Sequence, residues 1–174
     1  DLTIMEESAE LVKKLEKGDN KYPLFTSCCP GWIRFAETKH PELLPYISTC
    51  RSPMEMFGAV IKEYYKPADK EAGLETVSVA VMPCVAKKYE AARPEFVRDG
   101  VPDVDYVITT KELISMIREL GIQFNELEPG SPDMPFSISS GSGVIFGVTG
   151  GVMEAALRKV ADKSDFAMKE IEYS

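Results

Sequence analysis

The fold of this chain is decided by the stretch Thr76-Val77-Ser78-Val79-Ala80-Val81-Met82-Pro83-Cys84. Its valine content predicts a buried strand over residues 76–82. A helical pattern then runs through Lys87 and Glu90 and is closed by Pro94. The stretch therefore predicts a strand that passes directly into a helix, which is the repeating unit of a parallel sheet.

Strands and helices alternate on both sides of this stretch. Capping boxes, in which Ser or Thr is followed three residues later by Glu, predict helices that open at Thr3, Ser52 and Thr109. The helix that opens at Ser52 is expected to end at Pro67. Further helices are predicted from Pro30 and over residues 152–162, and short strands over residues 22–26 and 106–108. This order predicts an α/β fold with a mostly parallel sheet flanked by helices.

Residues 123–142 are rich in Pro, Gly, Ser and acidic side chains, which predicts a linker or long loop. The linker divides the chain into a first α/β lobe over residues 1–122 and a second segment over residues 143–174. That second segment is expected to form a Gly-rich loop and a helix that open a second lobe. A helical pattern begins almost at Asp1, so we expect the chain to be a piece of a longer protein.

Charge and composition exclude several functional classes. The net charge of −8 argues against binding to nucleic acid, which requires Lys and Arg at the phosphates. No apolar run approaches the roughly 20 residues that span a bilayer. The one histidine, His40, lies between two helical patterns in a predicted loop. A His-based metal site or a Ser-His-Asp triad is therefore poorly supported.

The four cysteines are Cys28, Cys29, Cys50 and Cys84. None of them forms the C-x₂₋₄-C pair that is typical of a zinc site. A disulfide framework is also poorly supported, because the sequence shows no secretory signal. Cys29 and Cys84 each follow a predicted strand and precede a helix, which places both at the carboxyl edge of the sheet. Helix N-termini favour thiolates, and thiolates at one edge suit an iron–sulfur cluster. From position alone, two buried core thiols are an equal alternative.

Three motifs carry a resemblance to a known family. Thr26-Ser27-Cys28-Cys29-Pro30-Gly31-Trp32 and Met82-Pro83-Cys84-Val85-Ala86-Lys87-Lys88-Tyr89-Glu90 resemble the first two signatures of the iron-only ([FeFe]) hydrogenases. The run from Phe146 to Arg158 resembles a further block of that family. The resemblance covers nearly the whole chain. It implies one lobe of a two-lobed catalytic domain and the start of the second lobe.

The resemblance implies an H-cluster, in which a [4Fe–4S] cubane is joined to a two-iron unit. That unit carries CO, cyanide and a bridging dithiolate, and the reaction is 2H⁺ + 2e⁻ ⇌ H₂. By motif, Cys29 and Cys84 resemble two cubane ligands, and Cys28 resembles the thiol that passes protons. Lys87 resembles the lysine that donates to a cyanide ligand. Cys50 matches a position without chemistry and is expected in the core.

Other residues match the surroundings of the cluster. Glu7, Ser48 and Glu10 match the proton path of the family, with Lys14 in place of an arginine at its outer end. A solvated charged face is the alternative for this stripe of the first helix. Met54 stands where many members carry glutamine. The residues that resemble the pocket around the two-iron unit are Met54, Met82, Pro83, Gly143, Phe146 and Gly147.

The resemblance also sets expectations for the complete protein. The family needs a second cysteine pair, which these residues lack, so we expect the isolated chain to be inactive and to lack the complete cluster. The expected partners are the remainder of the hydrogenase chain, a ferredoxin-type electron carrier and H-cluster maturation proteins, in the cytoplasm. The alternatives are a hydrogenase-like iron–sulfur assembly protein and an H₂ sensor. Assembly proteins of this type generally lack a cysteine at the position of Cys28.

Overall fold

The computed structural model describes residues 1–18 and 23–161, which form two compact units. One unit contains the described residues of Asp1–Arg51 and Pro132–Ser174, and the other is Ser52–Ser131. Tyr22 and Asp162, the predicted ends of a strand and of the last helix, lie outside the described residues. The lobe boundaries predicted at residues 122 and 143 concern the complete catalytic domain and stay a prediction.

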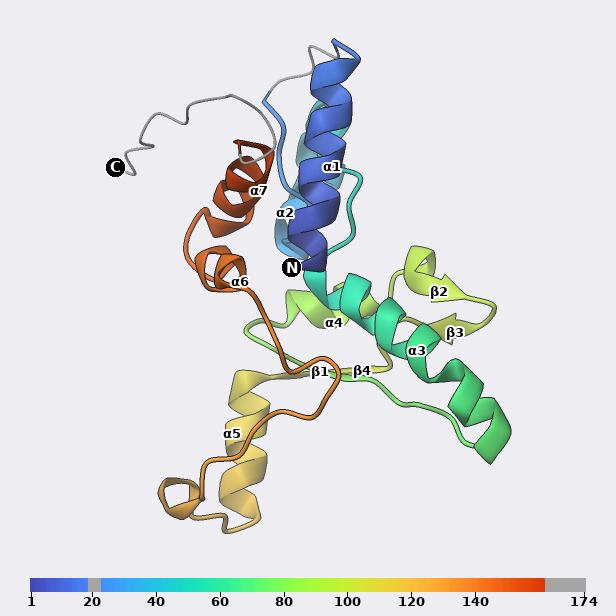
Figure 1. Cartoon of the computed structure of the whole chain (residues 1–174), viewed down its shortest axis with the longest axis vertical. Helices are drawn as coiled ribbons and strands as arrows, with labels where there is room; N and C mark the ends of the chain where they lie inside the picture. Colours follow the sequence, from blue (N-terminus) through green and yellow to red (C-terminus); the bar gives the residue numbers. More distant parts are fainter. Residues whose placement is uncertain (19–22, 162–174) are drawn as a thin grey trace. The chain divides into compact units, whose positions relative to one another are not determined.

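The first unit is built from helices. The long helix α1 packs along α7, and α7 also packs against the short helix α6 (Figure 1). Ala155 and Ala156 of α7 are buried, as are Ile4 and Leu11 of α1. The elements of this unit are α1 (Leu2–Glu16), α2 (Pro30–Lys39), the 3₁₀ helix η1 (Pro41–Tyr46), α6 (Gly141–Phe146) and α7 (Gly151–Ala161).

A single parallel bridge between Phe25 and Ile47 replaces the strand predicted over residues 22–26. Phe25 N donates to Tyr46 O at 2.8 Å, and Ser48 N donates to Phe25 O at 2.7 Å. Pro23 has no N–H to extend the ladder. The bridge nevertheless places residues 26–29 beside residues 48–51, where Ser27 Oγ donates to the carbonyl oxygen of Cys50.

The second unit contains the predicted strand–helix repeat. Strand β1 (Val79–Met82) pairs in parallel with β4 (Tyr106–Thr109), with Val79 opposite Tyr106 and Met82 opposite Thr109. Helices α4 (Ala86–Ala91) and α5 (Thr110–Glu119) follow these strands (Figure 1). The α/β prediction is confirmed. The other elements are α3 (Pro53–Ala72), η2 (Pro94–Phe96), β2 (Val97–Arg98), β3 (Val101–Pro102) and η3 (Phe124–Glu126).

Polar contacts hold α3 against the start of the two strands. Lys62 Nζ of α3 lies 2.6 Å from Asp105 Oδ2, and Ser78 N donates to the same oxygen at 2.6 Å. Gly58 of α3 is packed so closely on Asp103 and Val104 that a β-carbon there would overlap the Asp103 carbonyl. Strand β1 is shorter than predicted and is not buried throughout, since Val79 and Val81 are exposed.

Two of the three predicted capping boxes are borne out at the N-cap. Ser52 accepts the Glu55 N–H at 3.4 Å, and Thr109 and Glu112 form a complete reciprocal box. The box predicted at Thr3 is wrong, because α1 already begins at Leu2 and leaves Asp1 at the N-cap without a side-chain cap bond.

Two other predictions about helix boundaries are wrong. Helix α3 continues through Pro67 to Ala72 and ends at Gly73, whose φ is 65°. Its last turn is fixed from outside, because Asp69 Oδ2 accepts the Thr76 N–H at 2.8 Å. The predicted Gly-rich loop contains helix α6, whose N-cap residue Ser140 donates its N–H to Asp1 Oδ2 at 2.8 Å.

Candidate functional site

Cys29 is the N-cap residue of α2. Its Sγ accepts the Trp32 N–H at 3.4 Å, and Pro30 follows at the first helical position. Proline suits this position because its missing N–H would have no partner in the helix. The thiol is free and exposed, so it can bind a ligand from outside the unit. A helix N-terminus also favours the negative charge that a thiolate ligand carries.

Cys28 is half-buried, unlike its neighbour. Its Sγ lies 4.0 Å from Thr26 Oγ1. The two adjacent thiols thus have different surroundings, one enclosed beside a hydroxyl and the other capping a helix. Separate chemical roles for the two cysteines are compatible with this arrangement.

Three residues of the predicted proton path lie together in the first unit. Ser48 Oγ donates to Glu10 Oε2 at 3.1 Å, and Lys14 Nζ lies 3.0 Å from Glu10 Oε1. Glu7 is one turn before Glu10 on α1 and is almost fully buried, with 2% of its surface exposed. The stripe is therefore not a solvated charged face, because two of its carboxylates are turned into the unit.

The pKa values of Glu7 and Glu10 are shifted in opposite directions. Burial raises the pKa of Glu7, and the charge of Glu10 acts in the same direction, although the nearby Ser48 hydroxyl and Lys14 oppose it. Burial also acts to raise the pKa of Glu10, but donors from Thr49 and Lys14 outweigh it and lower that pKa. The surroundings of Glu7 therefore favour its protonated form more than water does, and those of Glu10 favour its carboxylate.

Cys50, which was expected in the core, is half-buried rather than fully buried, and its Sγ lies 3.6 Å from Glu10 Oε2. Burial raises the pKa of its thiol to about 11, and the charges of Glu7 and Glu10 contribute to the rise. Cys50 is thus a neutral thiol near neutral pH.

Cys84 lies in the second unit, between the end of β1 and the start of α4. Its thiol is free and exposed. Met82 is the last residue of β1 and is half-buried, and Pro83 beside it is exposed. The strand end and helix start predicted around Cys84 are confirmed. Cys29 belongs to the other unit, so the prediction that both cysteines share one edge stays a prediction.

Lys87 is buried in the first turn of α4, where its Nζ lies 2.8 Å from Glu90 Oε2. Glu90 is buried as well, with 4% of its surface exposed. An enclosed ammonium with a carboxylate partner is held in one place, since its other rotamers would leave a buried charge unpaired. The sequence motif contains Glu90, but its pairing with Lys87 was not predicted.

The remaining predicted pocket residues are divided between the two units. Met54 of α3 is buried in the second unit. Gly143 and Phe146 of α6 are half-buried in the first, and Gly147 follows at the C-cap of that helix. Neither glycine has a positive φ, so backbone strain does not explain them. The assignment of these residues to a cluster pocket stays a prediction.

Free thiols at Cys29 and Cys84 fit the donor chemistry of an iron–sulfur cluster, which takes cysteine thiolates. They fit half of a cubane, because a cubane needs four such ligands. Within residues 1–18 and 23–161, no three His, Cys, Asp or Glu side chains are grouped as a complete metal site.

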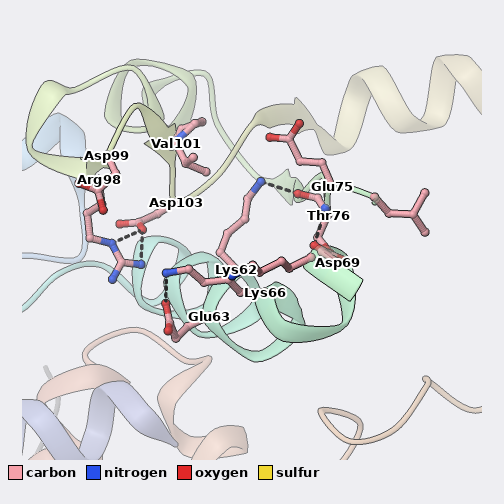
Figure 2. A pocket seen from close by; sticks show the side chains of 13 residues that line it. Lys62, Glu63, Lys66, Asp69, Glu75, Thr76, Arg98, Asp99, Val101 and Asp103 are labelled. Carbon is pink, nitrogen blue, oxygen red and sulfur yellow. Dashed lines mark hydrogen bonds and ion pairs between the residues drawn. The ribbon is translucent and has the colours of Figure 1, made fainter. Parts of the chain in front are cut away.

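A hollow of about 390 Å³ in the second unit is a separate feature, and none of the predicted site residues lines it. Figure 2 shows two ion pairs among the side chains that line it. Lys66 lies 3.5 Å from Glu63, and Arg98 lies 2.9 Å from Asp103. These four charged side chains of the hollow are therefore already paired. None of the helices in the described part of the chain is long and apolar enough to cross a membrane.

Comparison with known proteins finds hydrogenases and related iron–sulfur assembly proteins. "Iron hydrogenase 1" of Clostridium pasteurianum is 48% identical over 174 residues, which cover 99% of this chain and 30% of that protein. The "Periplasmic [Fe] hydrogenase large subunit" of Nitratidesulfovibrio vulgaris is 51% identical over 159 residues, covering 91% and 38%. "Cytosolic iron-sulfur assembly component 3" of Bos taurus is 35% identical over 170 residues, covering 92% and 36%.

Among solved structures, the apo [FeFe]-hydrogenase HydA1 from Chlamydomonas reinhardtii superposes with a TM-score of 0.81 at 42% identity. The match covers 100% of this chain and 44% of that one, so the chain spans less than half the length of its relatives. The family described as "Iron only hydrogenase large subunit, C-terminal domain" matches residues 1–174. Agreement along the whole chain in sequence and in fold shows that this chain belongs to the iron-only hydrogenase large-subunit family.

Proposed function

We propose that this chain is part of a hydrogenase that interconverts protons, electrons and H₂ at an H-cluster. One observation carries the proposal: the Glu10 carboxylate joins Ser48 on one side and Lys14 on the other, next to a buried Glu7. Burying a carboxylate costs free energy unless it is paired and hydrogen-bonded, so it suggests a functional role. Carboxyl groups that lie next to one another can transfer a proton.

In this proposal Cys29 and Cys84 hold iron through their thiolates. The H-cluster, when bound, supplies the electrons and the centre at which they combine with protons. Cys28 accepts or donates the proton at the cluster, because a thiol with an ordinary pKa near 8.5 exchanges protons at neutral pH. Glu7, Ser48 and Glu10 then carry that proton along α1 to Lys14.

The other residues shape the surroundings. Lys87 would donate to a cyanide ligand of the bound cluster, and its partner Glu90 holds the ammonium in place. Met54, Met82, Pro83, Gly143, Phe146 and Gly147 line the pocket of the two-iron unit.

The remaining proposals concern the complete protein. Electrons pass to or from a ferredoxin-type carrier, the remainder of the hydrogenase chain supplies the other two cubane ligands, and maturation proteins insert the cluster. We place the protein in the cytoplasm. With two ligands of the four, residues 1–174 alone do not turn over H₂.

The test compares two cysteine variants of the hydrogenase that contains this chain, after maturation. Cys28→Ser should leave the iron content intact and lower turnover by about 10²–10⁴-fold, because a serine hydroxyl, unlike a thiol, is too weak an acid to give up its proton at the cluster near neutral pH. Cys84→Ser should instead lower the iron per protein, because a thiolate ligand is lost. If Cys28→Ser empties the site of iron as Cys84→Ser does, Cys28 is a ligand and the relay is wrong.

The same measurement separates the hydrogenase from its relatives in iron–sulfur assembly, whose identity to this chain is 35–38%. An assembly protein would bind iron in the unmutated form yet show no H₂ turnover. An H₂ sensor would show turnover too slow for Cys28→Ser to change.

A further inference from the structure

The Glu10 carboxylate is surrounded by donors from one short segment. Its Oε2 accepts the Thr49 hydroxyl at 2.8 Å, the Thr49 N–H at 3.0 Å and the Ser48 hydroxyl at 3.1 Å. The Cys50 thiol adds a weaker contact at 3.6 Å. Segment 48–50 therefore directs four donors at a single oxygen, and two of them belong to Thr49.

Glu7, one helical turn away, receives no such set. Both of its carboxylate oxygens are buried, and neither accepts a hydrogen bond of ordinary geometry from the described residues, although the Ser48 hydroxyl is near enough to act on its charge. Two carboxyls on the same face of α1 thus stand in opposite environments. The surroundings of Glu7 shift it toward the neutral acid, and those of Glu10 shift it toward the carboxylate.

We propose that Thr49 is a positioning residue, which holds Glu10 as an oriented carboxylate ready to receive the proton that leaves Glu7. The proposal rests on the proposed function, since it assumes that Glu10 lies on the path of the proton. Nothing in the family motifs quoted above gives Thr49 this part.

Thr49 is singled out by what its neighbours already do. The Ser48 hydroxyl donates to Glu10 and accepts the Cys50 N–H at 3.1 Å, and it is itself a step of the proposed proton path. The Cys50 thiol is a weak donor. Lys14 binds the other oxygen, at 3.0 Å. Thr49 therefore supplies the strong donors to Oε2 that are not themselves steps of the relay.

The other titratable groups around Glu10 do not replace this contribution. Lys14 lies on the same helix and pairs with the other oxygen of Glu10, Glu7 is one turn away, and Cys50 is neutral near neutral pH. Helix α7, which packs along α1, carries Glu154, Arg158 and Lys159, and Arg158 is paired with Glu154 at 2.6 Å.

The test uses Thr49→Val, which removes the hydroxyl and keeps the shape, and Thr49→Ser, which keeps the hydroxyl. Both are made in the matured hydrogenase that contains this chain. Thr38→Val is the control, because the Thr38 hydroxyl donates to the Arg34 carbonyl oxygen within α2 at 2.8 Å. Two readouts are taken: the pH dependence of H₂ turnover, and the titration of the Glu10 carboxyl carbon by NMR, assigned by its loss in Glu10→Gln.

Thr49→Val should raise the proton affinity of Glu10 by about three- to tenfold. A hydrogen bond to a buried charge would give more, but Thr49 is exposed and water replaces part of the lost donor. Because Glu10 must be ionised to accept a proton, the acid side of the turnover profile should move to higher pH by the same factor. Thr49→Ser should restore both readouts, and Thr38→Val should change neither.

The outcomes distinguish the two proposals. An unchanged Glu10 titration in Thr49→Val overturns the role of Thr49, whatever happens to turnover. A shifted titration with an unchanged turnover profile removes Glu10 from the proton path, and with it the proposed relay. A parallel shift of both supports the inference.

Discussion

Replacing Glu90 with leucine should destabilise the second unit, because the buried Lys87 side chain would lose its carboxylate partner. The side chains of Lys87 and Glu90 are 11% and 5% exposed, and the N–O distance is 2.8 Å. Removal of one partner from a buried ion pair typically costs about 3–5 kcal/mol. Glu90→Gln keeps the volume and one oxygen acceptor, so it should cost less, about 1.5–3 kcal/mol.

The assay is urea denaturation of the chain, followed by the helical circular dichroism signal. Glu63→Gln is the matched control, since Glu63 and Lys66 have the same three-residue spacing in the same unit but are 66% and 69% exposed. An exposed pair of this kind should cost about 0–0.5 kcal/mol. If Glu90→Leu unfolds at the same urea concentration as the unmutated chain, Glu90 does not hold Lys87, and the proposed orientation of the ammonium loses its support.

Two further predictions follow from packing and from thiol chemistry. Gly58→Ala should destabilise the second unit by about 1–3 kcal/mol, because the new β-carbon would lie 2.6 Å from Val104 Cγ2, and a denaturation midpoint equal to that of the unmutated chain would contradict the packing. Cys29 and Cys84 should react with iodoacetamide at pH 8 well before Cys50, which is half-buried and whose pKa is raised to about 11; equal labelling of the three in peptide mass spectra would show that Cys50 is not enclosed.

The elements that were predicted correctly have strong local signals. The side chains of Thr109 and Glu112 each accept a hydrogen bond from the backbone N–H of the other residue. Because both residues lie within one stretch of four, this capping box does not depend on the rest of the fold. The valines of β1 find a parallel partner in β4. The box at Thr3 failed because helix α1 begins at Leu2, which leaves Thr3 inside the helix and buried.

One hairpin had a readable signal that the sequence analysis missed. Strands β2 and β3 are joined by Asp99-Gly100, and both residues have positive φ, 51° and 80°. Asp-Gly between two short extended runs is a strong signal for a two-residue hairpin. The runs here are only two residues long on each side, and so they do not show the alternation that marks a strand.

The residues of the candidate site that the sequence identifies are those that belong to a recognisable motif. Cys29 and Cys84 stand out because a cysteine at the start of a helix is a local feature. Thr49 and Glu90 matter through partners, and the pairing of Thr49 with Glu10 spans 39 positions of the chain. No periodicity in the sequence of α1 shows that a loop after η1 will direct its donors at one of two similar glutamates.

The unequal treatment of Glu7 and Glu10 is itself an argument for function. A chain selected for stability alone would share the donors of segment 48–50 between the two carboxyls, or replace the buried Glu7 by an apolar residue, because an unsatisfied buried polar group costs about 1–3 kcal/mol. The structure instead concentrates four donors on Glu10 and leaves Glu7 enclosed. Buried polar groups without hydrogen-bond partners are found in proteins mainly at functional sites. A carboxyl whose surroundings favour the acid, one helical turn from a carboxyl whose surroundings favour the carboxylate, is such a case.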